Sequence, residues 1–293
     1  MTASPATGPQ GSVAAAYPSV PEGWTVVERR SAGPFTTGLT LVHRDGRRME
    51  WSSRTHRKHA SRLSRTHGAR EGMLWAPHRA SWWIAVLFMV GSTCFLVGPL
   101  TGFIDLVGAR VDGLVFFVGS VFFTSAAALQ WLETVNADHV PGQRLHGRLR
   151  VLTWEPHRVD WWSSGVQLLG TLFFNVTTFR ALSTAPDASA YDRVVWQPDA
   201  LGSVCFLVSG YLAYVEVAHG LLRLPPRTLE GTIGALNLFG CLAFGVSAVA
   251  GFVLPATGVE VNVSLTNAST AVGALAFLVG SALLLPDGAR DPS

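Results

Sequence analysis

Glu216 is the residue whose type and position most directly suggest chemistry, because it lies inside a long apolar stretch, where a charged side chain is costly and often functional. Tyr211 and Tyr214 precede it, and His219 follows about one helical turn later. Two interpretations compete. In one, Glu216 and His219 bind a proton or a cation on a transport route. In the other, Glu216 forms a structural salt bridge.

The structural interpretation is a charge clasp that would close pairs of helices. Each pair of apolar stretches begins with an arginine and ends with a carboxylate that we expect on the same membrane face. The expected partners are Arg79 with Glu133, Arg158 with Glu216, and Arg227 with Asp287. Their spacing is not uniform, so the clasp fits the first pair least well.

Three amides, Gln167, Asn175 and Asn237, are the other polar candidates within the apolar stretches. Hydrogen bonding between helices is their ordinary role, and each such bond contributes about 0.6 kcal/mol. The alternative is that they join Glu216 in lining a path for ions or small solutes.

Signatures of enzymes and of metal sites are missing from the sequence. It has no HExxH, GxSxG, P-loop or dinucleotide motif. Cys94, Cys205 and Cys241 lie in apolar runs without ligand or disulfide spacing. We therefore expect no catalytic activity, no metal and no cofactor.

The composition places these residues in a membrane protein. Only 14% of the chain is charged, against about 25% in a typical soluble domain. Six continuous apolar stretches are long enough, or nearly so, to cross a bilayer as helices. They are residues 82–103, 113–132, 161–179, 200–222, 231–254 and 268–286.

The basic residues predict the orientation. With the N-terminus in the cytoplasm, all but Arg110, Arg180 and Arg193 of the 22 arginines and lysines fall on the cytoplasmic side. Lys58 is the only lysine, a skew typical of GC-rich bacterial genomes. We expect a multi-pass protein of the bacterial cell (inner) membrane, with both termini in the cytoplasm.

The stretches repeat in pairs. Residues 75–79 and 154–158 share a Trp-x-Pro-His-Arg motif followed by two tryptophans, and residues 224–227 carry a decayed copy. Small residues recur with a phenylalanine in every stretch, which allows close helix packing. In the third and fifth stretches, Gly170 and Gly240 share a helix face with Gln167 and Asn237, and we expect these faces to point inward.

Pairs of spans with a Phe-x-x-Gly-Ser signature resemble the YrhK-like family of small bacterial membrane proteins. The matching segments are 88–92, 116–120 and 277–281. The resemblance implies successive two-span units over about residues 75–286, and it implies no activity.

The sequence thus predicts an all-α integral membrane protein of six transmembrane helices in three tandem hairpins, with a small N-terminal cytoplasmic part. The expected segments are a disordered tail (1–23), a basic region (24–74), hairpins at 75–137, 150–222 and 223–286, and a cytoplasmic tail (287–293). Asp45-Gly46 favours a β-hairpin with a type I′ turn.

Arginines and histidines dominate residues 54–70. Their competing interpretations are a topology signal resting on anionic lipid headgroups, a surface for an acidic partner, and nucleic-acid binding. The last is disfavoured because no recognition module accompanies the charge. Expected partners are therefore the bilayer, and either a second copy of the chain or another membrane protein.

The sequence favours a non-catalytic role in scaffolding, assembly or the cell envelope. The alternative is a small channel or carrier for ions or small solutes, using Glu216 and the polar faces of the third and fifth stretches.

Overall fold

The computed structural model describes residues 18–54, 57, 74–137, 148–183, 188–254 and 256–289, with the backbone alone for 188–189 and 287–289. Most of the predicted disordered tail, most of the basic segment 54–70 and most of the C-terminal tail lie outside the described residues. The side chain of Asp287 does too.

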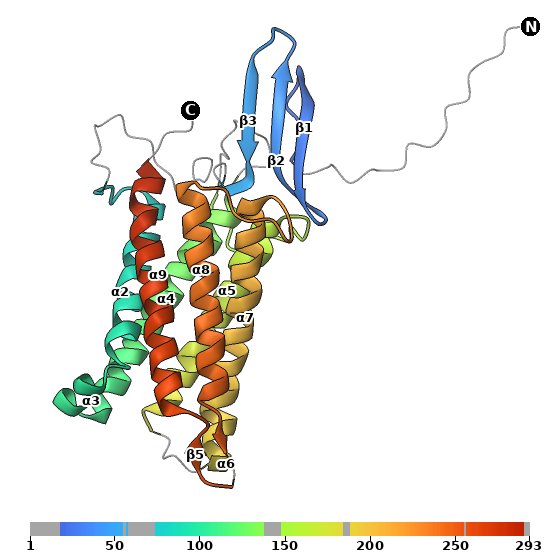
Figure 1. The fold of residues 1–293 in the computed structure, drawn as a ribbon. Helices are drawn as coiled ribbons and strands as arrows, with labels where there is room; N and C mark the ends of the chain where they lie inside the picture. The colour runs from blue at the N-terminus through green and yellow to red at the C-terminus, as the bar shows by residue number, and fades with distance from the viewer. Residues whose placement is uncertain are drawn as a thin grey trace, which may run out of the picture.

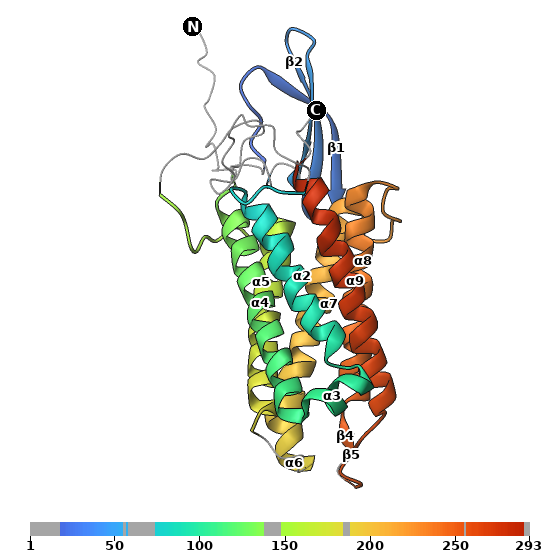
Figure 2. The ribbon, with the colours of Figure 1, turned by 90° about the vertical axis from the view of Figure 1, so that its left-hand side faces the viewer.

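Six long helices in the described residues form a closed ring (Figures 1 and 2). They are α2 (Ala80–Val97), α4 (Ala109–Val135), α5 (Val159–Ala181), α7 (Gln197–Ala218), α8 (Leu229–Ala250) and α9 (Val263–Ala289). Each packs against the next in chain order, and α9 packs against α2. The pairs α2–α4, α5–α7 and α8–α9 are thus three consecutive units around one axis.

Five of these helices are long and apolar enough to cross a membrane. The exception is α5, whose serines, threonines and amides lower its hydropathy. The first apolar stretch is shorter than predicted, because α2 ends at Val97, before Gly98 and Pro99. A separate short helix, α3 (Thr101–Val107), takes up the rest.

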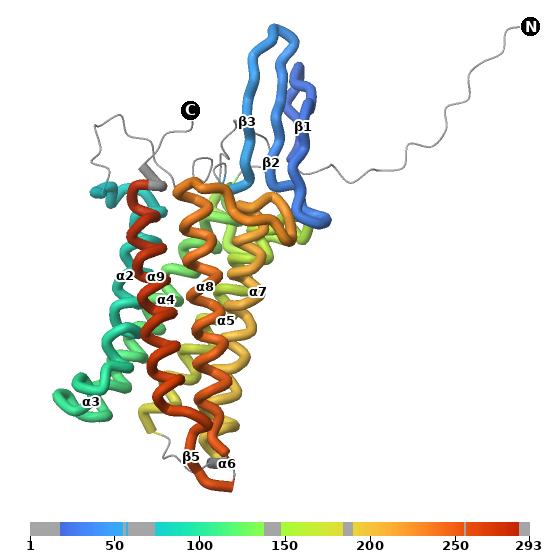
Figure 3. The backbone as a smooth tube through the Cα atoms, viewed as in Figure 1, coloured from blue at the N-terminus to red at the C-terminus, as the bar shows by residue number. Residues whose placement is uncertain are grey.

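A small antiparallel sheet stands at one end of the ring, hereafter the sheet end; the end of α9 lies there as well (Figure 3). Its strands are β1 (Trp24–Ala32), β2 (Phe35–His43) and β3 (Arg48–Ser52), in that order. The opposite end carries α6 (Ala188–Tyr191), a π-helical turn (Asp192–Trp196), and the short strands β4 (Val253–Leu254) and β5 (Val259–Glu260).

The β2–β3 hairpin was predicted, whereas β1 was not. Charged residues Glu28 to Arg30 and two register shifts interrupt the alternation that marks a strand. The predicted type I′ turn is wrong. Of Asp45 and Gly46 only Gly46 has a positive φ, 90°, whereas a type I′ turn needs both. The amide of Gly46 donates to the carbonyl of His43, which closes a longer loop with a glycine bulge.

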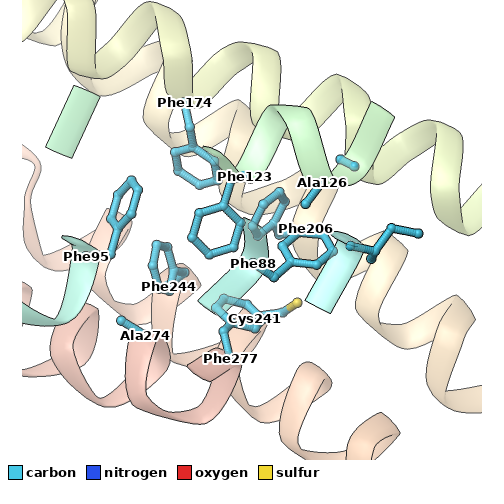
Figure 4. Packing of buried hydrophobic residues seen from close by; sticks show 12 residues of the cluster. Phe88, Phe95, Phe123, Ala126, Phe174, Phe206, Cys241, Phe244, Ala274 and Phe277 are labelled. Carbon is cyan, nitrogen blue, oxygen red and sulfur yellow. The ribbon is translucent and has the colours of Figure 1, made fainter. Parts of the chain in front are cut away.

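Buried phenylalanines from all six helices meet on the axis of the ring (Figure 4). Within each pair, the ring of one helix lies against a glycine of the other. A Cβ added to Gly170 would lie 2.7 Å from Phe206, and one added to Gly202 would lie 3.3 Å from Phe174. The same reciprocal contacts join Gly91 with Phe123, Gly119 with Phe95, Gly240 with Phe277, and Gly273 with Phe244.

These contacts define the repeat as Gly-x-x-x-Phe in every long helix, and they correct one sequence alignment. Phe123, rather than Phe116, is the structural counterpart of Phe206 and Phe277, so the match at 116–120 is displaced by two helical turns. In this register each of three glycines precedes a carboxylate by fourteen residues: Gly119 and Glu133, Gly202 and Glu216, Gly273 and Asp287.

The tryptophan motif has the same structure in its first two copies. The indole of Trp82 donates to the carbonyl of Leu74 at 3.0 Å, and that of Trp161 donates to Thr153 at 3.0 Å. Arg79 and Arg158 occupy the helix N-cap. In the third copy Thr228 occupies this position instead of Arg227, and its hydroxyl accepts the amide of Gly231.

Candidate functional site at the sheet end

Arg57 enters the sheet end of the ring from the segment that follows β3, and it meets two carboxylates there. Its Nη1 lies 3.3 Å from Oδ2 of Asp160 on α5 and 3.6 Å from Oε2 of Glu216 on α7. Arg57 is only 7% exposed, and both carboxylates are buried. Burial by itself would lower the pKa of Arg57, but Glu216 and Asp160 outweigh it and the pKa is raised. Arg57 therefore stays charged.

Asp160 also joins Arg57 to a second buried arginine. Arg158 Nη2 lies 2.6 Å from Asp160 Oδ2, and Arg158 Nη1 lies 2.5 Å from Glu155 Oε2. Arg158 is 1% exposed. The start of α5 thus carries a continuous ionic network. Each charge in it has an opposite charge or a hydrogen bond, which offsets the free energy lost when the charge is removed from water.

Glu133, at the end of α4, completes the group from a third direction. It is 5% exposed, and it lines a common cavity with Arg54 and Arg57. Its position relative to the glycine of its helix matches that of Glu216, so the two carboxylates are equivalent in the repeat. Arg57 therefore lies where the ends of consecutive helix pairs converge.

The sheet is fastened to the helices by three further contacts. The hydroxyl of Ser53 donates to Oε1 of Glu216. Nδ1 of His219 lies 2.8 Å from the hydroxyl of Thr37 in β2. Ala32 of β1 packs into an apolar cluster with Val159 of α5 and Val215 of α7.

His219 ends α7 in the left-handed conformation, with φ 50°. Burial and the neighbouring Arg30 and Arg223 lower its pKa, although Glu230 opposes them. A neutral His219 can hydrogen-bond with Thr37 without burying a second positive charge beside Arg30. This residue therefore joins the sheet to α7, instead of standing within a span as the sequence left open.

The second predicted clasp, Arg158 with Glu216, is not among the described ion pairs. The ion pairs described for Arg158 go to Glu155 and Asp160, whereas Glu216 pairs with Arg57. Arg227 is exposed at the start of the third pair, and the side chain of Asp287 lies outside the described residues. Arg79 is half-buried at its N-cap. The charges at the sheet end thus link the N-terminal region to the ring as well as helices to one another.

A cavity of about 110 Å³ lies on the axis between this charged group and the phenylalanines. Gln167 of α5 and Asn237 of α8 line it, as the inward-facing stripes predicted, together with Gln130 of α4. Its walls also include Phe123 and Cys241. Glu216 is not among the residues that line it, so the structure does not bring Glu216 together with the two amides.

Asn175 has a separate role. Its amide nitrogen donates to the hydroxyl of Thr124 at 2.9 Å, and Ser120 and Thr178 hydroxyls meet at 2.9 Å nearby. These bonds join α4 to α5, which is the inter-helix role expected from the sequence. Asn175 therefore belongs to the packing between the first and second pairs.

Sequence reasoning did not single out Asp160, Ser53 or Arg57 individually. Asp160 carried one usable signal, because it follows Arg158 inside a helix start where a charge is costly. Arg57 carried none, since it is one of many basic residues in its segment. In the described part of the chain no group of three His, Cys, Asp or Glu residues could hold a metal ion. The arrangement attaches the sheet to the helix ends through buried ion pairs and hydrogen bonds.

Comparisons with protein-family models, with curated proteins and with solved structures found no match to this chain.

Proposed function

We propose that this chain is a six-span protein of a bacterial cell membrane with its sheet end in the cytoplasm. Five apolar helices support the membrane location. The sixth, α5, packs between α4 and α7 within the same ring, and this packing supports a sixth crossing beside them. The excess of arginine at the sheet end and the exposed Trp75 and Trp154 fit a cytoplasmic, lipid-facing boundary. Anionic headgroups are the expected lipid partners there.

Topology reporters test this arrangement. A periplasm-active phosphatase fused after Ser183 should be active, and the same enzyme fused after Leu152 should be inactive, because α5 separates the two positions. Activity after Leu152 would contradict the proposed orientation, and inactivity after both positions would mean that α5 does not cross the bilayer.

The role that this geometry supports best is non-catalytic: the helices hold the sheet in a defined position at the membrane surface, as a scaffold or assembly platform. The observation that carries the proposal is the insertion of Arg57 among buried carboxylates. A buried ion pair with good geometry costs several kcal/mol to break. The sheet is therefore held in place, and within the described residues its outer strands, β1 and β3, have one unpaired edge each for a partner strand.

Photo-crosslinking in native membranes tests the scaffold role. A photoreactive amino acid at Val27, which is 60% exposed on β1, should give one discrete adduct with a second copy or with another protein. Substituting Arg57→Gln in the same protein should abolish that adduct, because the sheet would no longer be held. Failure to form any adduct, or an adduct indifferent to Arg57→Gln, would contradict the proposal.

A channel or carrier is the second candidate, favoured by the cavity on the axis. Proteoliposomes containing a trapped pH dye should show proton flux above that of empty liposomes, and Glu216→Gln should reduce it. Flux equal to that of empty liposomes would eliminate proton transport. The contacts of Glu216 with Arg57 and Ser53 make this candidate weaker, because they occupy the carboxylate.

Membership of the YrhK-like family also stays a prediction. The three consecutive helix pairs with shared small-residue contacts support it.

A further inference from the structure

The cavity has equivalent walls from all three helix pairs. Phe88, Gln167 and Asn237 each stand three residues before the repeated glycine of α2, α5 and α8, and all three line the cavity. The first pair contributes an apolar ring at this level, whereas the other two contribute amides. At this position of the repeat, the cavity wall is therefore polar at α5 and α8 and apolar at α2.

Two amides and one guanidinium N–H at the cavity have no hydrogen-bond partner among the described residues. The side chains of Gln167 and Asn237 line the cavity and form no hydrogen bond with any described residue. The Nε of Arg57 is buried and has no acceptor there either. Buried polar groups in folded proteins are nearly always satisfied, by protein, water or ligand. The buried Nε of Arg57, together with the two half-buried amides beside it in the cavity wall, therefore indicates an occupant that offers both acceptors and donors.

The charge around the cavity argues for an uncharged occupant. The described ion pairs join two arginines, Arg57 and Arg158, to three carboxylates, Glu155, Asp160 and Glu216. Arg54 and Glu133 bring one charge of each sign to the cavity wall. Each charge in the described ion pairs already has an opposite charge within 3.6 Å, so an added cation or anion would be desolvated without a new counter-ion. The groups of Gln167, Asn237 and Arg57 that lack partners are neutral amides and one N–H.

The volume of the cavity and the residues at its deep end limit the occupant further. About 110 Å³ is somewhat below an engineered cavity of ~150 Å³ that binds benzene. Phe123, Phe206 and Phe277 form the deep wall, and Cys241 lies beside them. We propose that this cavity binds a small uncharged molecule with a carbonyl or hydroxyl head between Arg57, Gln167 and Asn237, and a compact apolar body against the phenylalanines. The site goes beyond the scaffold role and does not depend on it.

Cys241 provides a natural reporter, since it lines the cavity and is 3% exposed. The full chain with Cys94→Ala and Cys205→Ala keeps both Cβ atoms and leaves this single thiol. Benzamide, benzoate and benzylammonium share one ring and differ in the charge of the head. We expect benzamide to slow the alkylation of Cys241 by N-ethylmaleimide and to raise the thermal unfolding temperature of the full chain, with little effect from the other two.

Gln167→Leu and Asn237→Leu should each weaken the benzamide effect by about tenfold, because each removes one hydrogen-bonding group from the cavity. Asn175→Leu is the matched control: it removes an amide from α5 that bonds to Thr124 outside the cavity wall, and should leave the benzamide effect unchanged. Stronger protection by benzoate or benzylammonium would overturn the assignment of an uncharged ligand. If none of the three protects Cys241 or raises the unfolding temperature, the cavity holds water only and the site is refuted. Loss of crosslinking at Val27 would leave this result unaffected, so the two proposals fail separately.

Discussion

Arg57 Nη1 lies 3.6 Å from Oε2 of Glu216, and the two residues come from opposite parts of the chain: a segment after the N-terminal sheet and the last turn of α7. Ser53 donates to the same carboxylate from the same segment. The carboxylate therefore holds the N-terminal region against the helices.

Replacing Arg57 by methionine should destabilise the protein strongly. Asp160 and Glu216 would lose a buried cation, and breaking such a pair typically costs about 3–5 kcal/mol. Chemical unfolding of the purified full chain in detergent measures the change. Arg29→Met is the control, since Arg29 is exposed and bonds only weakly to Thr36, at 3.4 Å. Adding Glu216→Gln to Arg57→Met should recover part of the loss; full additivity of the two changes would show that the residues are not coupled.

Substituting Gly240→Ala should also destabilise the ring. The new Cβ would lie 2.7 Å from the ring of Phe277, and overpacking of this kind costs about 1–3 kcal/mol. Gly102→Ala in α3 is the matched control, because a Cβ there meets nothing within 4 Å. Alanine should be neutral or stabilising at Gly102, by up to about 1 kcal/mol from helix propensity. The measurement is the thermal unfolding temperature of each variant. Equal temperatures for Gly240→Ala and Gly102→Ala would mean that α8 and α9 do not pack as described.

Attachment of the sheet should weaken in acid through His219. Its pKa in the folded protein is lowered from the ordinary 6.5, chiefly by burial, so the folded state favours the neutral ring. The stability that it contributes is complete above about pH 6.5. That contribution is lost as the pH falls from there through the lower folded pKa. Hydrogen exchange of β2 amides between pH 7.5 and 5 measures the effect.

The control for this pH dependence is His219→Asn. Asparagine tolerates the left-handed conformation and has no titration in this range, so exchange in β2 should become nearly independent of pH once the intrinsic rates are removed. A persistent acid weakening in His219→Asn would assign the effect to another group.

Thr228→Ala should destabilise the third helix pair by about 1 kcal/mol, because the threonine hydroxyl caps α8 by accepting the amide of Gly231. Thr232→Ala, which removes an exposed hydroxyl bonded within the same helix, is the comparison. Equal unfolding midpoints for the two variants would argue against a capping role for Thr228.

The long helices and the β2–β3 hairpin could be predicted because both depend on local signals. A continuous apolar run of sufficient length specifies a helix that lipid or protein must cover, and Asp45-Gly46 marks a turn whatever surrounds it. The inward faces of α5 and α8 were also predictable: helical periodicity places Gly170 and Thr171 on one side, and they are buried. Strand β1 was missed because its charged residues hide the alternation that a strand normally shows.

The alignment of the repeat could not be settled from the sequence. The signature aligns Gly119-Ser120 of α4 with Gly280-Ser281 of α9, two turns from the contact that matters in α9, and only the packing of Phe123 against Gly91 and of Phe244 against Gly273 identifies the equivalent level. With that register, the carboxylates at 133, 216 and 287 become equivalent positions, although their spacing from the predicted span starts was uneven.

The sequence by itself determined which segments are helical, which faces of α5 and α8 point inward, and that Glu216 and Arg158 need opposite charges, since hydropathy, periodicity and the cost of an unpaired charge are properties of a residue and its near neighbours. Only the tertiary structure decided that Glu216 is paired with Arg57, that Arg158 is paired with Asp160 and Glu155, and that Gln167 and Asn237 share a cavity. The reason is that the partner of each charge depends on which helix ends lie together. The closure of six helices into one ring brings together ends that are far apart in the sequence, and no local sequence pattern specifies this.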